Sequence, residues 1–462
     1  MSKPRAMVLI DGEHYVSVLQ GAIEWAMKNY TDREIVVAVF LGGTEKIGSP
    51  EDVKKALPIP VHFLKDPTDA DEIVRIAKEY GVEIVMDLSD EPILSYEKRF
   101  WIASAVLAEG MRYEGSDFVF GPLKLLNIAR KPVIKVMGLG KRVGKTAISE
   151  YTAITVKSLG KMPCVIKAGR GGPPEPRVVF GYELELTPQF LLSIADRGEH
   201  AASDYWEEAL IGKIVTIGAR RCGGGMAGKP FYTTEIDAVL KANELPQVDF
   251  IIIEGSGTTI PPIVSDANEL VVSAYTPVEH VATYFGPLRV RMSDLVVLTL
   301  AEEHNLDKIE KLEKAVKEIK PSVKTTWVVF RPEPLGDIRG KKVFFASTAK
   351  KHDIEKVLVP YLEKVYGCKV VYYSPHLSNR PKLREDLEKG LPQAEVLLTE
   401  LKAAAVDVAT REALKRGLEV VYVNYVPKSV GGDVAIDEGI KNLVELALKR
   451  FEERRKSIDI AK

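Results

Sequence analysis

Cysteine is scarce in this chain of 462 residues, which contains only Cys164, Cys222 and Cys368. The three cysteines are widely spaced and form no CxxC pair, so the sequence predicts neither a disulfide framework nor a zinc site. Because unpaired thiols are typical of a reducing compartment, we expect a cytoplasmic protein.

An excess of charge of either sign is also missing, since 64 Lys and Arg residues face 65 Asp and Glu residues. No apolar run approaches the roughly 20 residues that a membrane-spanning helix requires. The chain has neither the overall field that attracts nucleic acid nor a membrane segment, so we expect neither kind of partner. Any anion that the protein binds must be held by a local cluster of cations.

Amide side chains are rare as well. The chain has four Gln and eight Asn residues, whereas Lys, Arg and Glu are plentiful. This bias is typical of proteins that work at high temperature, and it indicates a thermophilic source.

The length of the chain exceeds the roughly 250 to 300 residues that a single core ordinarily supports. Short apolar runs alternate with helical patterns, which is typical of βαβ units and a parallel sheet. We predict an α/β protein with a P-loop NTPase-like central domain at 126–340, built on a parallel sheet. An N-terminal α/β domain at 1–125 and a C-terminal α/β domain at 341–462 flank it. The expected strands lie at 6–10, 34–43, 60–64, 83–88, 131–140, 162–169, 213–220, 248–257, 293–302, 325–332, 341–349, 369–375, 394–404 and 418–427.

The stretch GLGKRVGKT at 138–146 ends like a phosphate-binding loop, although Leu139 stands where a glycine is expected five residues before Gly144. In such a loop, backbone N–H groups at a strand-to-helix turn point at the phosphates, a lysine reaches the outer phosphates and a hydroxyl holds Mg²⁺. An apolar strand precedes this stretch and an amphipathic helix follows it, as the motif requires. We expect the nucleotide to be bound by Gly138, Gly140, Lys141, Val143, Gly144, Lys145, Thr146 and Ala147.

A second motif strengthens this interpretation. The apolar run at 248–253 ends at Glu254, and Gly-Ser-Gly follows at once. In a parallel sheet, the carboxyl ends of the strands open at the same edge as the phosphate loop. A carboxylate there can coordinate Mg²⁺ directly or through water, so we expect Thr146 and Glu254 to hold the metal. A carboxylate that only caps a turn is the simpler alternative.

Two glycine-rich segments follow predicted strands and carry cations. Lys167 and Arg170 precede one segment, while Arg220 and Arg221 precede the other, which Lys229 closes. Arginine suits phosphate because its planar fork binds two oxygens at once. A single such cation would be interpreted more simply as a solvated surface charge, but two clusters in loops at strand ends favour an anion-binding site.

Together these motifs resemble known families. The loop at 138–146, paired with IEGSG at 253–257, resembles the dethiobiotin synthetase branch of phosphate-loop enzymes. More specifically, segments along almost the whole chain resemble the archaeal cyclic 2,3-diphosphoglycerate synthetase family. These segments are LIDGEHY (9–15), GLGKRVGKTA (138–147), KAGRGGPPEP (167–176), IGARRCGGGMAG (217–228), IEGSG (253–257) and TELKAAAVDV (399–408).

The resemblance implies an enzyme that uses ATP to close 2,3-diphosphoglycerate into a cyclic pyrophosphate, with release of ADP and phosphate. Our hypothesis is that the γ-phosphoryl group moves to one substrate phosphate, after which the neighbouring phosphate attacks with loss of inorganic phosphate. Both steps join anions, so catalysis depends mostly on positioning and charge neutralisation. We expect ATP and Mg²⁺ as cofactors and a homodimer as the assembly.

The resemblance also suggests roles for single residues. Lys145, Lys167 and Arg170 are expected to be catalytic. His14 ends the first strand within a matching segment, and we expect it to contact the substrate. The complete set of expected substrate-binding residues is His14, Arg170, Arg220, Arg221 and Lys229.

Two other functions fit parts of the sequence. One is a ligase of the dethiobiotin synthetase type that acts on another acidic metabolite. The other is a nucleotide-dependent switch or metallochaperone, which shares the loop architecture. Such proteins usually carry His/Cys metal-ligand clusters, and the scattered cysteines of this chain do not indicate one.

Overall fold

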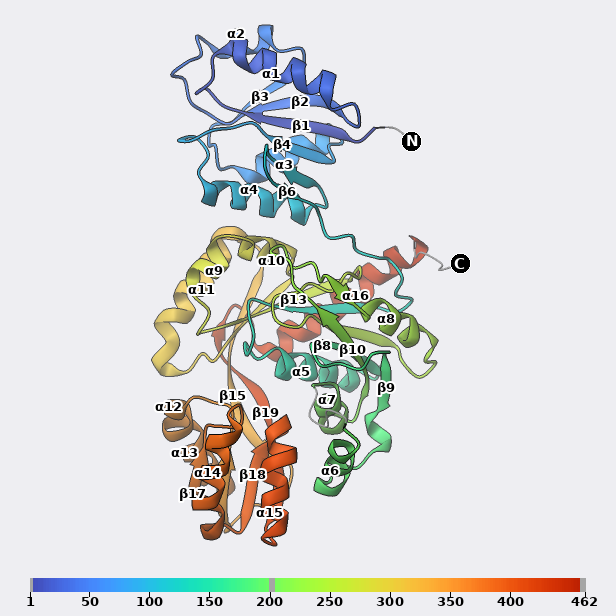
Figure 1. Ribbon diagram of the computed structural model, residues 1–462, viewed down its shortest axis with the longest axis vertical. Helices are drawn as coiled ribbons and strands as arrows, with labels where there is room; N and C mark the ends of the chain where they lie inside the picture. The colour runs from blue at the N-terminus through green and yellow to red at the C-terminus, as the bar shows by residue number, and fades with distance from the viewer. Residues whose placement is uncertain (1–2, 199–203, 458–462) are drawn as a thin grey trace.

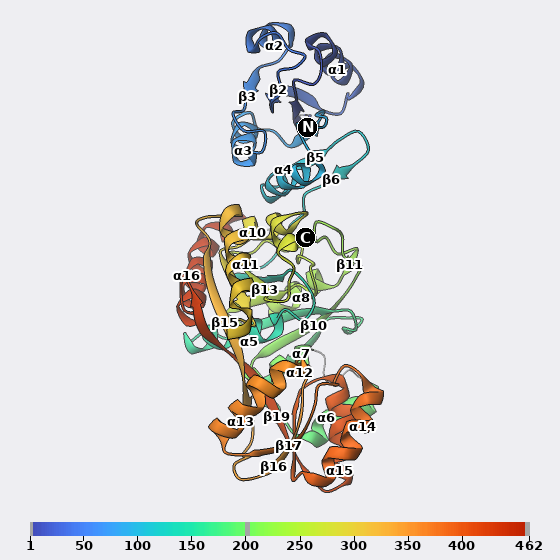
Figure 2. The same ribbon diagram turned by 90° about the vertical axis from the view of Figure 1, so that its left-hand side faces the viewer.

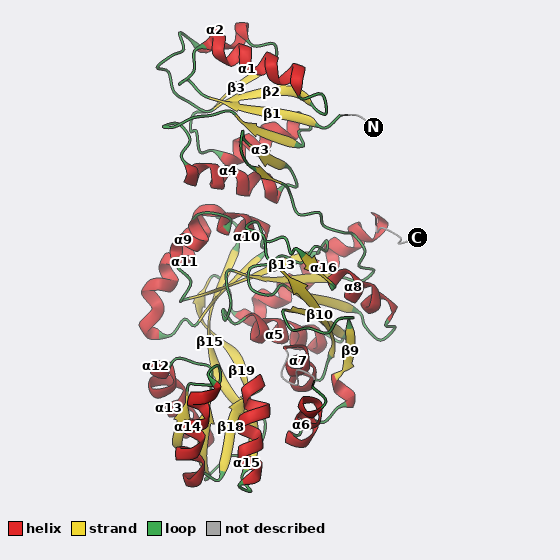
Figure 3. Cartoon of the chain, viewed as in Figure 1, coloured by secondary structure: helices red, strands yellow, loops and turns green. Residues whose placement is uncertain are grey.

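The computed structural model describes residues 3–198 and 204–457 (Figure 1). Three units follow one another along its longest axis, with the N-terminal unit at one end and the C-terminal α/β unit at the other. The order is the same in the view turned by 90° (Figure 2). Helices and strands alternate in every unit (Figure 3), and most paired strands run parallel. The predicted α/β fold class is confirmed.

The N-terminal unit is a six-stranded sheet in the order β3-β2-β1-β4-β5-β6, in which only the β5–β6 pair is antiparallel. Apolar cores lie on both faces of the sheet, which explains the continuous apolar run in β1. The sequence pattern did not predict α4, β5 or the pairing of β6. The elements are β1 (Arg5–Ile10), α1 (Val16–Asn29), β2 (Glu34–Phe40), α2 (Pro50–Ala56), β3 (Val61–Phe63), α3 (Ala70–Glu79), β4 (Ile84–Asp87), α4 (Tyr96–Ala108), β5 (Arg112–Glu114) and β6 (Val119–Phe120).

The central unit has the strand order β11-β10-β8-β12-β7-β13-β14-β15, and β7, which leads into the phosphate loop, pairs in parallel with β12 and β13. Its first elements are β7 (Val133–Gly138), α5 (Lys145–Ser158), β8 (Pro163–Gly169), β9 (Arg177–Phe180), η1 (Gly181–Glu183), α6 (Pro188–Asp196), α7 (Asp204–Gly212), β10 (Val215–Cys222), β11 (Tyr232–Thr233) and α8 (Glu235–Glu244). The others are β12 (Phe250–Glu254), β13 (Ala267–Ser273), α9 (Val278–Ala282), α10 (Gly286–Met292), β14 (Leu295–Thr299), η2 (Glu303–Asn305), α11 (Leu306–Ile319) and β15 (Lys324–Pro334).

The central sheet contains strands that the sequence pattern did not predict. β13 lies directly beside β7, and β9 and β11 both pair antiparallel with β10. The two glycine-rich segments are therefore anchored by short strands, which limits how far their loops extend from the sheet.

The C-terminal unit continues the same sheet, because β15 pairs antiparallel with β19, followed by β18, β16 and β17. After β19 the chain returns to the central unit, where α16 packs on the core around β7 and α5. The elements are β16 (Lys342–Ala346), α12 (Lys351–Asp353), η3 (Ile354–Leu358), α13 (Val359–Tyr366), β17 (Lys369–Ser374), α14 (Arg380–Gly390), η4 (Leu391–Gln393), β18 (Val396–Glu400), η5 (Ala405–Thr410), α15 (Arg411–Lys415), β19 (Glu419–Gly432), α16 (Ile436–Arg454) and η6 (Arg455–Ser457).

Contacts join the N-terminal unit to α10 of the central unit. Ser104 Oγ donates a hydrogen bond to the carbonyl of Tyr284 at 3.1 Å, and Arg291 forms an ion pair with Asp71 at 2.5 Å. The predicted boundaries at 125 and 340 stay predictions about folding units. The shared sheet and the return of α16 mean that the C-terminal segment also completes the central core.

Candidate active site

Two glycines shape the loop between β7 and α5. Gly144 has a φ of 91°, in the left-handed region, and a Cβ built on it would lie 2.7 Å from Phe330 Cζ. A Cβ on Gly138 would lie 2.8 Å from Lys145 Cδ. The left-handed backbone of Gly144 therefore requires glycine, whereas a side chain at Gly138 would displace the end of the Lys145 side chain. Leu139 is only 8% exposed and packs in the apolar core, so the position that lacks the expected glycine contributes to packing instead.

The side chain of Lys145 folds back over this loop. Its Nζ donates hydrogen bonds to the carbonyls of Gly140, at 2.9 Å, and Gly257, at 3.0 Å. Lys145 is buried, and this burial lowers the pKa of its ammonium group. An ammonium held by backbone carbonyls at the turn before α5 can exchange these partners for phosphate oxygens.

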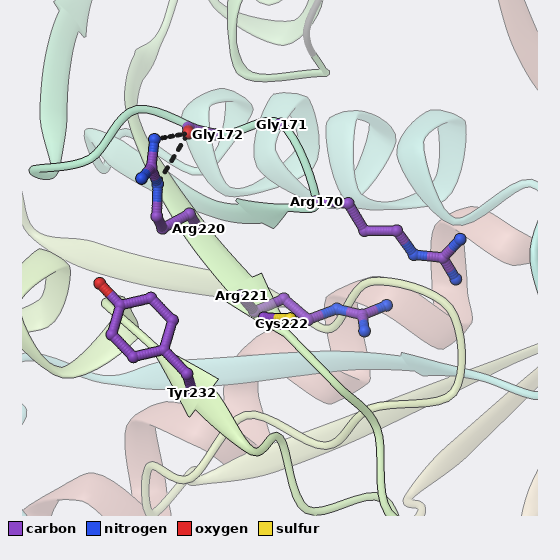
Figure 4. Close-up of a pocket in the computed structure, with 7 residues that line it drawn as sticks. All are labelled: Arg170, Gly171, Gly172, Arg220, Arg221, Cys222 and Tyr232. Atoms are coloured by element: carbon purple, nitrogen blue, oxygen red, sulfur yellow. Dashed lines mark hydrogen bonds between the residues drawn. The ribbon is translucent and has the colours of Figure 1, made fainter.

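Three arginines line a pocket of about 450 Å³ at the carboxyl ends of β8 and β10 (Figure 4). Nε and Nη2 of Arg220 donate to the carbonyl of Gly172 at 3.0 and 2.9 Å, which fixes that side chain at one side of the pocket. No carboxylate is among the lining residues within the described part of the chain. The lining residues are Arg170, Gly171, Gly172, Arg220, Arg221, Cys222 and Tyr232.

Arg221 is the most buried of these arginines. Its Nη2 donates to the carbonyl of Ser256 at 2.6 Å and to the Ser256 hydroxyl at 3.2 Å. Burial lowers the pKa of Arg221, and the like charge of Arg170 lowers it further. A bound anion would relieve this repulsion between the two guanidinium groups, so the pocket favours a ligand with negative charge.

The phosphate loop and the arginine pocket meet at Ser256 and Gly257. Lys145 donates to the carbonyl of Gly257, and Arg221 donates to the carbonyl of Ser256. A Cβ built on Gly257 would lie 3.2 Å from Arg221 Nη2 and 3.7 Å from Arg170 Nη2. The structure thus brings the phosphate-loop lysine and two of the predicted arginines to one short segment after β12.

Lys167 lies in a different environment, on the side of the sheet that α5 covers. Its Nζ forms an ion pair with Glu208 at 2.7 Å and a second with Glu254, and it donates to Ser149 Oγ at 2.8 Å. Burial alone would lower the pKa of Lys167, but the charges of Glu208 and Glu254 outweigh this effect, and the pKa is raised. Lys167 therefore stays protonated in a buried network and does not line the arginine pocket.

The two predicted metal ligands lie on neighbouring elements. Thr146 is half-buried in the first turn of α5, and Glu254 ends β12, where it pairs in register with Val136 of β7. Ser149 donates to Glu254 Oε2 at 3.0 Å, so the carboxylate is oriented toward α5. A hydroxyl and a carboxylate at this edge are hard oxygen donors of the kind that Mg²⁺ requires, so the residues present fit that ion.

The other predicted nucleotide residues surround the loop. Val143 is buried, and its carbonyl accepts a hydrogen bond from Thr299 of β14 at 2.7 Å, which holds the loop against the sheet. Ala147 packs at the edge of the core around α5. Lys141 is exposed at the crest of the loop.

Two predicted substrate residues lie outside the pocket. Lys229 is exposed and is not among the lining residues, and its carbonyl accepts a hydrogen bond from the backbone of Gly225 at 2.8 Å. His14 lies in the N-terminal unit, where Nδ1 is 2.8 Å from Asp11 Oδ1 and Nε2 is 3.2 Å from Asp90 Oδ2. The carboxylates of Asp11 and Asp90 therefore hold the imidazole ring of His14 in place without a substrate.

Sequence reasoning missed several residues that the structure places at these sites. Ser149 follows Lys145 by four residues and so shares its helix face, which is a signal that the sequence does carry. Tyr232, which lines the pocket across from Arg221, stands in a segment that was identified only by its glycines (Figure 4). Glu208 lies on α7, and no local pattern indicates its contact with Lys167.

None of the helices in the described ranges has both the length and the apolar character of a membrane span.

Comparison with known proteins covers all three units. Family models for the N-terminal, P-loop and C-terminal domains of cyclic 2,3-diphosphoglycerate synthetase match residues 5–121, 133–329 and 334–426. A cyclic 2,3-diphosphoglycerate synthetase of Methanothermus fervidus is 47% identical, over 98% of this chain and 100% of its own. Another, of Methanothermobacter thermautotrophicus, is 45% identical over 97% of each chain.

A solved structure, the hydrogenase maturation factor HypB of Archaeoglobus fulgidus, aligns with 43% of this chain and 82% of its own at 15% identity. Its TM-score of 0.28 is too low to support an argument. The family models and the full-length relatives, in contrast, match nearly the whole chain. They confirm the resemblance that the motifs indicated. The chain belongs to the cyclic 2,3-diphosphoglycerate synthetase family.

Proposed function

We propose that this protein uses ATP and Mg²⁺ to convert 2,3-diphosphoglycerate into cyclic 2,3-diphosphoglycerate, with release of ADP and inorganic phosphate. The names of its full-length relatives support the product. The observation that carries the rest is the meeting of Lys145, Arg170 and Arg221 at the segment of Ser256 and Gly257. A nucleotide phosphate and an anionic substrate would be adjacent there.

The arginine pocket suits the proposed substrate. 2,3-Diphosphoglycerate carries two phosphates and a carboxylate, and closing it into a ring brings the two phosphates together against their repulsion. Arg170 and Arg221 lie in a pocket without a lining carboxylate among the described residues, so their charge is available to the ligand. Charge-assisted, bidentate contacts from such arginines would offset the repulsion and fix the two phosphates in an orientation for ring closure.

The phosphate loop would hold ATP, which supplies the phosphoryl group that activates the substrate. Lys145 would exchange the carbonyls of Gly140 and Gly257 for phosphate oxygens. The loop's backbone, with Gly138 and Gly144, would hold the phosphates at the start of α5. Because Lys145 and the arginines share one segment, the positive charge spans the path between nucleotide and substrate.

Thr146 and Glu254 would hold Mg²⁺ beside the nucleotide phosphates. The contacts of Lys167 support a role through this carboxylate, since its ammonium binds both Glu254 and Glu208. We infer that Lys167 positions Glu254 and moderates the negative charge of the two buried carboxylates. The catalytic role that the sequence predicted for Lys167 would then be indirect.

The test is incubation of the full-length protein with ATP, Mg²⁺ and 2,3-diphosphoglycerate, followed by ³¹P NMR and an ADP assay. We expect a cyclic pyrophosphate signal, with ADP and inorganic phosphate released in equal amounts. 3-Phosphoglycerate, which lacks the second phosphate, is the matched control and should yield no cyclic product. ADP release that is indifferent to 2,3-diphosphoglycerate would contradict the proposal. The homodimer and the cytoplasmic location stay predictions from the sequence.

A further inference from the structure

Two histidines and an aspartate that are distant in sequence meet where the central and C-terminal units join. His304 lies in η2, just after β14 of the central unit, whereas His352 and Asp353 form most of α12 in the C-terminal unit. In both whole-molecule views α12 lies at the end of its unit that faces the central sheet (Figures 1 and 2). Within 3–198 and 204–457, this is the one group of three such side chains whose potential ligand atoms cluster closely enough for a metal ion.

The distances fit metal coordination after small side-chain rotations. One ligand atom from each residue lies within 4.8 Å of the other two, and His304 Nε2 is 3.3 Å from Asp353 Oδ1. Two donors of a tetrahedral zinc site, each about 2.0 to 2.2 Å from the ion, are themselves roughly 3.3 Å apart. The His304–Asp353 pair therefore already has the separation of two ligands on one ion.

A second observation points to a missing partner. Asp353 Oδ1 is buried and, within the described residues, makes no hydrogen bond although His304 Nε2 lies 3.3 Å away, which is costly for a carboxylate oxygen. Its other oxygen, Oδ2, accepts a hydrogen bond from the Tyr275 hydroxyl at 3.0 Å. This hydroxyl fixes the carboxylate with Oδ1 directed at His304, in the way that an outer-shell partner orients a metal ligand.

We propose that His304, His352 and Asp353 bind a divalent transition-metal ion of the Zn²⁺ class. Two imidazole nitrogens and one carboxylate suit Zn²⁺ or Co²⁺, whereas Mg²⁺ and Ca²⁺ prefer oxygen ligands alone. The ammonium group of Lys350 lies 3.1 Å from the centroid of the Tyr275 ring, so the surroundings also carry a positive charge. A site of this kind depends on the histidines for its affinity.

The position of the site gives the ion a mechanical role. Thr299, at the end of β14, donates to the carbonyl of Val143 in the phosphate loop, and His304 follows five residues later. An ion shared between His304 and α12 would therefore tie the C-terminal unit to the strand end that supports the phosphate loop. This site is separate from the Mg²⁺ ligands proposed at Thr146 and Glu254, and it does not depend on the proposed reaction.

The experiment measures binding of Zn²⁺ and Co²⁺ to the metal-stripped full-length protein, by calorimetry and by the visible absorption of Co²⁺. We expect about one equivalent of metal bound at this site and a rise in Tm when Zn²⁺ is added. His304→Ala and His352→Ala should each abolish that equivalent, the Co²⁺ absorption and the rise in Tm. Tyr275→Phe, which removes the outer hydrogen bond, should weaken binding about tenfold.

His376→Ala is the matched control, because His376 also pairs with a carboxylate, Asp386 at 2.8 Å, but belongs to no three-residue group in the described chain. This variant should bind metal as the unsubstituted protein does. The proposal is overturned if the unsubstituted protein binds no equivalent of Zn²⁺, or if the bound equivalent survives in both His304→Ala and His352→Ala. Neither outcome would bear on the proposed cyclisation, whose test uses ³¹P NMR of substrate and product.

Discussion

The cations that the sequence placed at one sheet edge fall into two groups in the fold. Lys167, on the face that α5 covers, is buried between Glu208 and Glu254. Arg170, just past β8, and Arg221, near the end of β10, line the pocket, where none of the described lining residues is acidic. Lys167 and Arg170 are only three residues apart, yet one charge is neutralised by the protein and the other is left for a ligand.

The difference teaches how a predicted cation can be assigned. A strand alternates its side chains between the two faces of the sheet, and the loop that follows turns away from both. Lys167 is still within β8, so its side chain must point into a core and needs partners there. Arg170 follows the strand and is exposed. Within this one segment, the cation inside β8 is used by the fold, and the cation just past it is free to meet a ligand, whereas Arg221 lines the pocket from a position near the end of β10.

The largest expected effect comes from removing the buried cation, Lys167, and it is an effect on stability. Lys167→Met leaves Glu208 and Glu254 buried without their cation, which should lower the free energy of unfolding by about 3 to 5 kcal/mol. Denaturant unfolding measures this change. The double variant Lys167→Met/Glu208→Gln removes one of the orphaned charges and should regain part of the loss. Unchanged stability with lost turnover would instead assign Lys167 the direct catalytic role that the sequence predicted.

Lys145→Ala should have the next largest effect, on turnover. Within the described residues the hydrogen bonds of Lys145 go to backbone carbonyls, so its removal breaks no ion pair there, and Tm should change little. Loss of one charged donor to the transferring phosphoryl group should lower kcat/KM by roughly 10²- to 10³-fold. Lys141→Ala, an exposed cation on the same loop, is the control and should affect turnover less. Wild-type turnover in Lys145→Ala would refute the nucleotide site.

Arg170→Ala tests the second group of cations, the arginines that line the pocket. Because Arg170 belongs to the pocket and has no role in the core, the variant should keep its stability and raise the KM for 2,3-diphosphoglycerate roughly 10- to 100-fold, as loss of a charge-assisted contact does. The KM for ATP should rise much less. Lys229→Ala, an exposed cation outside the pocket, is the control. A larger effect on the KM for ATP would place Arg170 on the nucleotide.

Most strands of the parallel sheet could be predicted because they are buried on both faces and read as continuous apolar runs. β13 was missed although it adjoins the phosphate-loop strand, because its run, ANELVVS, begins with polar residues. The pairing of β15 with β19 also escaped prediction. Nothing in a local pattern indicates that a strand near residue 330 pairs with one near residue 425, so the shared sheet became visible only in the fold.

In the site, too, local patterns could be predicted from the sequence and long-range contacts could not. Lys145, Arg170 and Arg221 were identified because a motif or a glycine-rich segment marks their place in sequence. Glu208 and His352 carry no such mark. Glu208 meets Lys167, which stands 41 residues earlier, and His352 meets His304, which stands 48 residues earlier, so both contacts depend on how the elements pack. The argument from scattered cysteines therefore indicated no metal-ligand cluster, whereas the fold brings two histidines and an aspartate together.

The smallest expected effect concerns Glu269, a buried glutamate that can be compared directly with Glu254. Glu269 and Glu254 both pair in register with Val136, one from each side of β7. Glu254 has Lys167 as its partner. In the described part of the chain, the side chain of Glu269 accepts a hydrogen bond only from the Thr152 hydroxyl, at 3.1 Å, and its Oε1 is buried without one. Burial raises the pKa of Glu269 to about 8, from the ordinary glutamate value of 4.5. Between these values the folded state binds one more proton than the unfolded state, so stability falls as the pH rises.

Glu269→Gln keeps the shape of the protonated side chain and cannot titrate. The variant and the unsubstituted protein should therefore have similar stability at pH 5, and the variant should be the more stable by about 1 to 2 kcal/mol at pH 7. Denaturant unfolding at the two pH values measures the difference. A difference that is the same at both pH values would contradict a raised pKa of Glu269. A pH-dependent difference would show that a carboxyl group buried beside Val136 without an ion-pair partner is held protonated in the folded state.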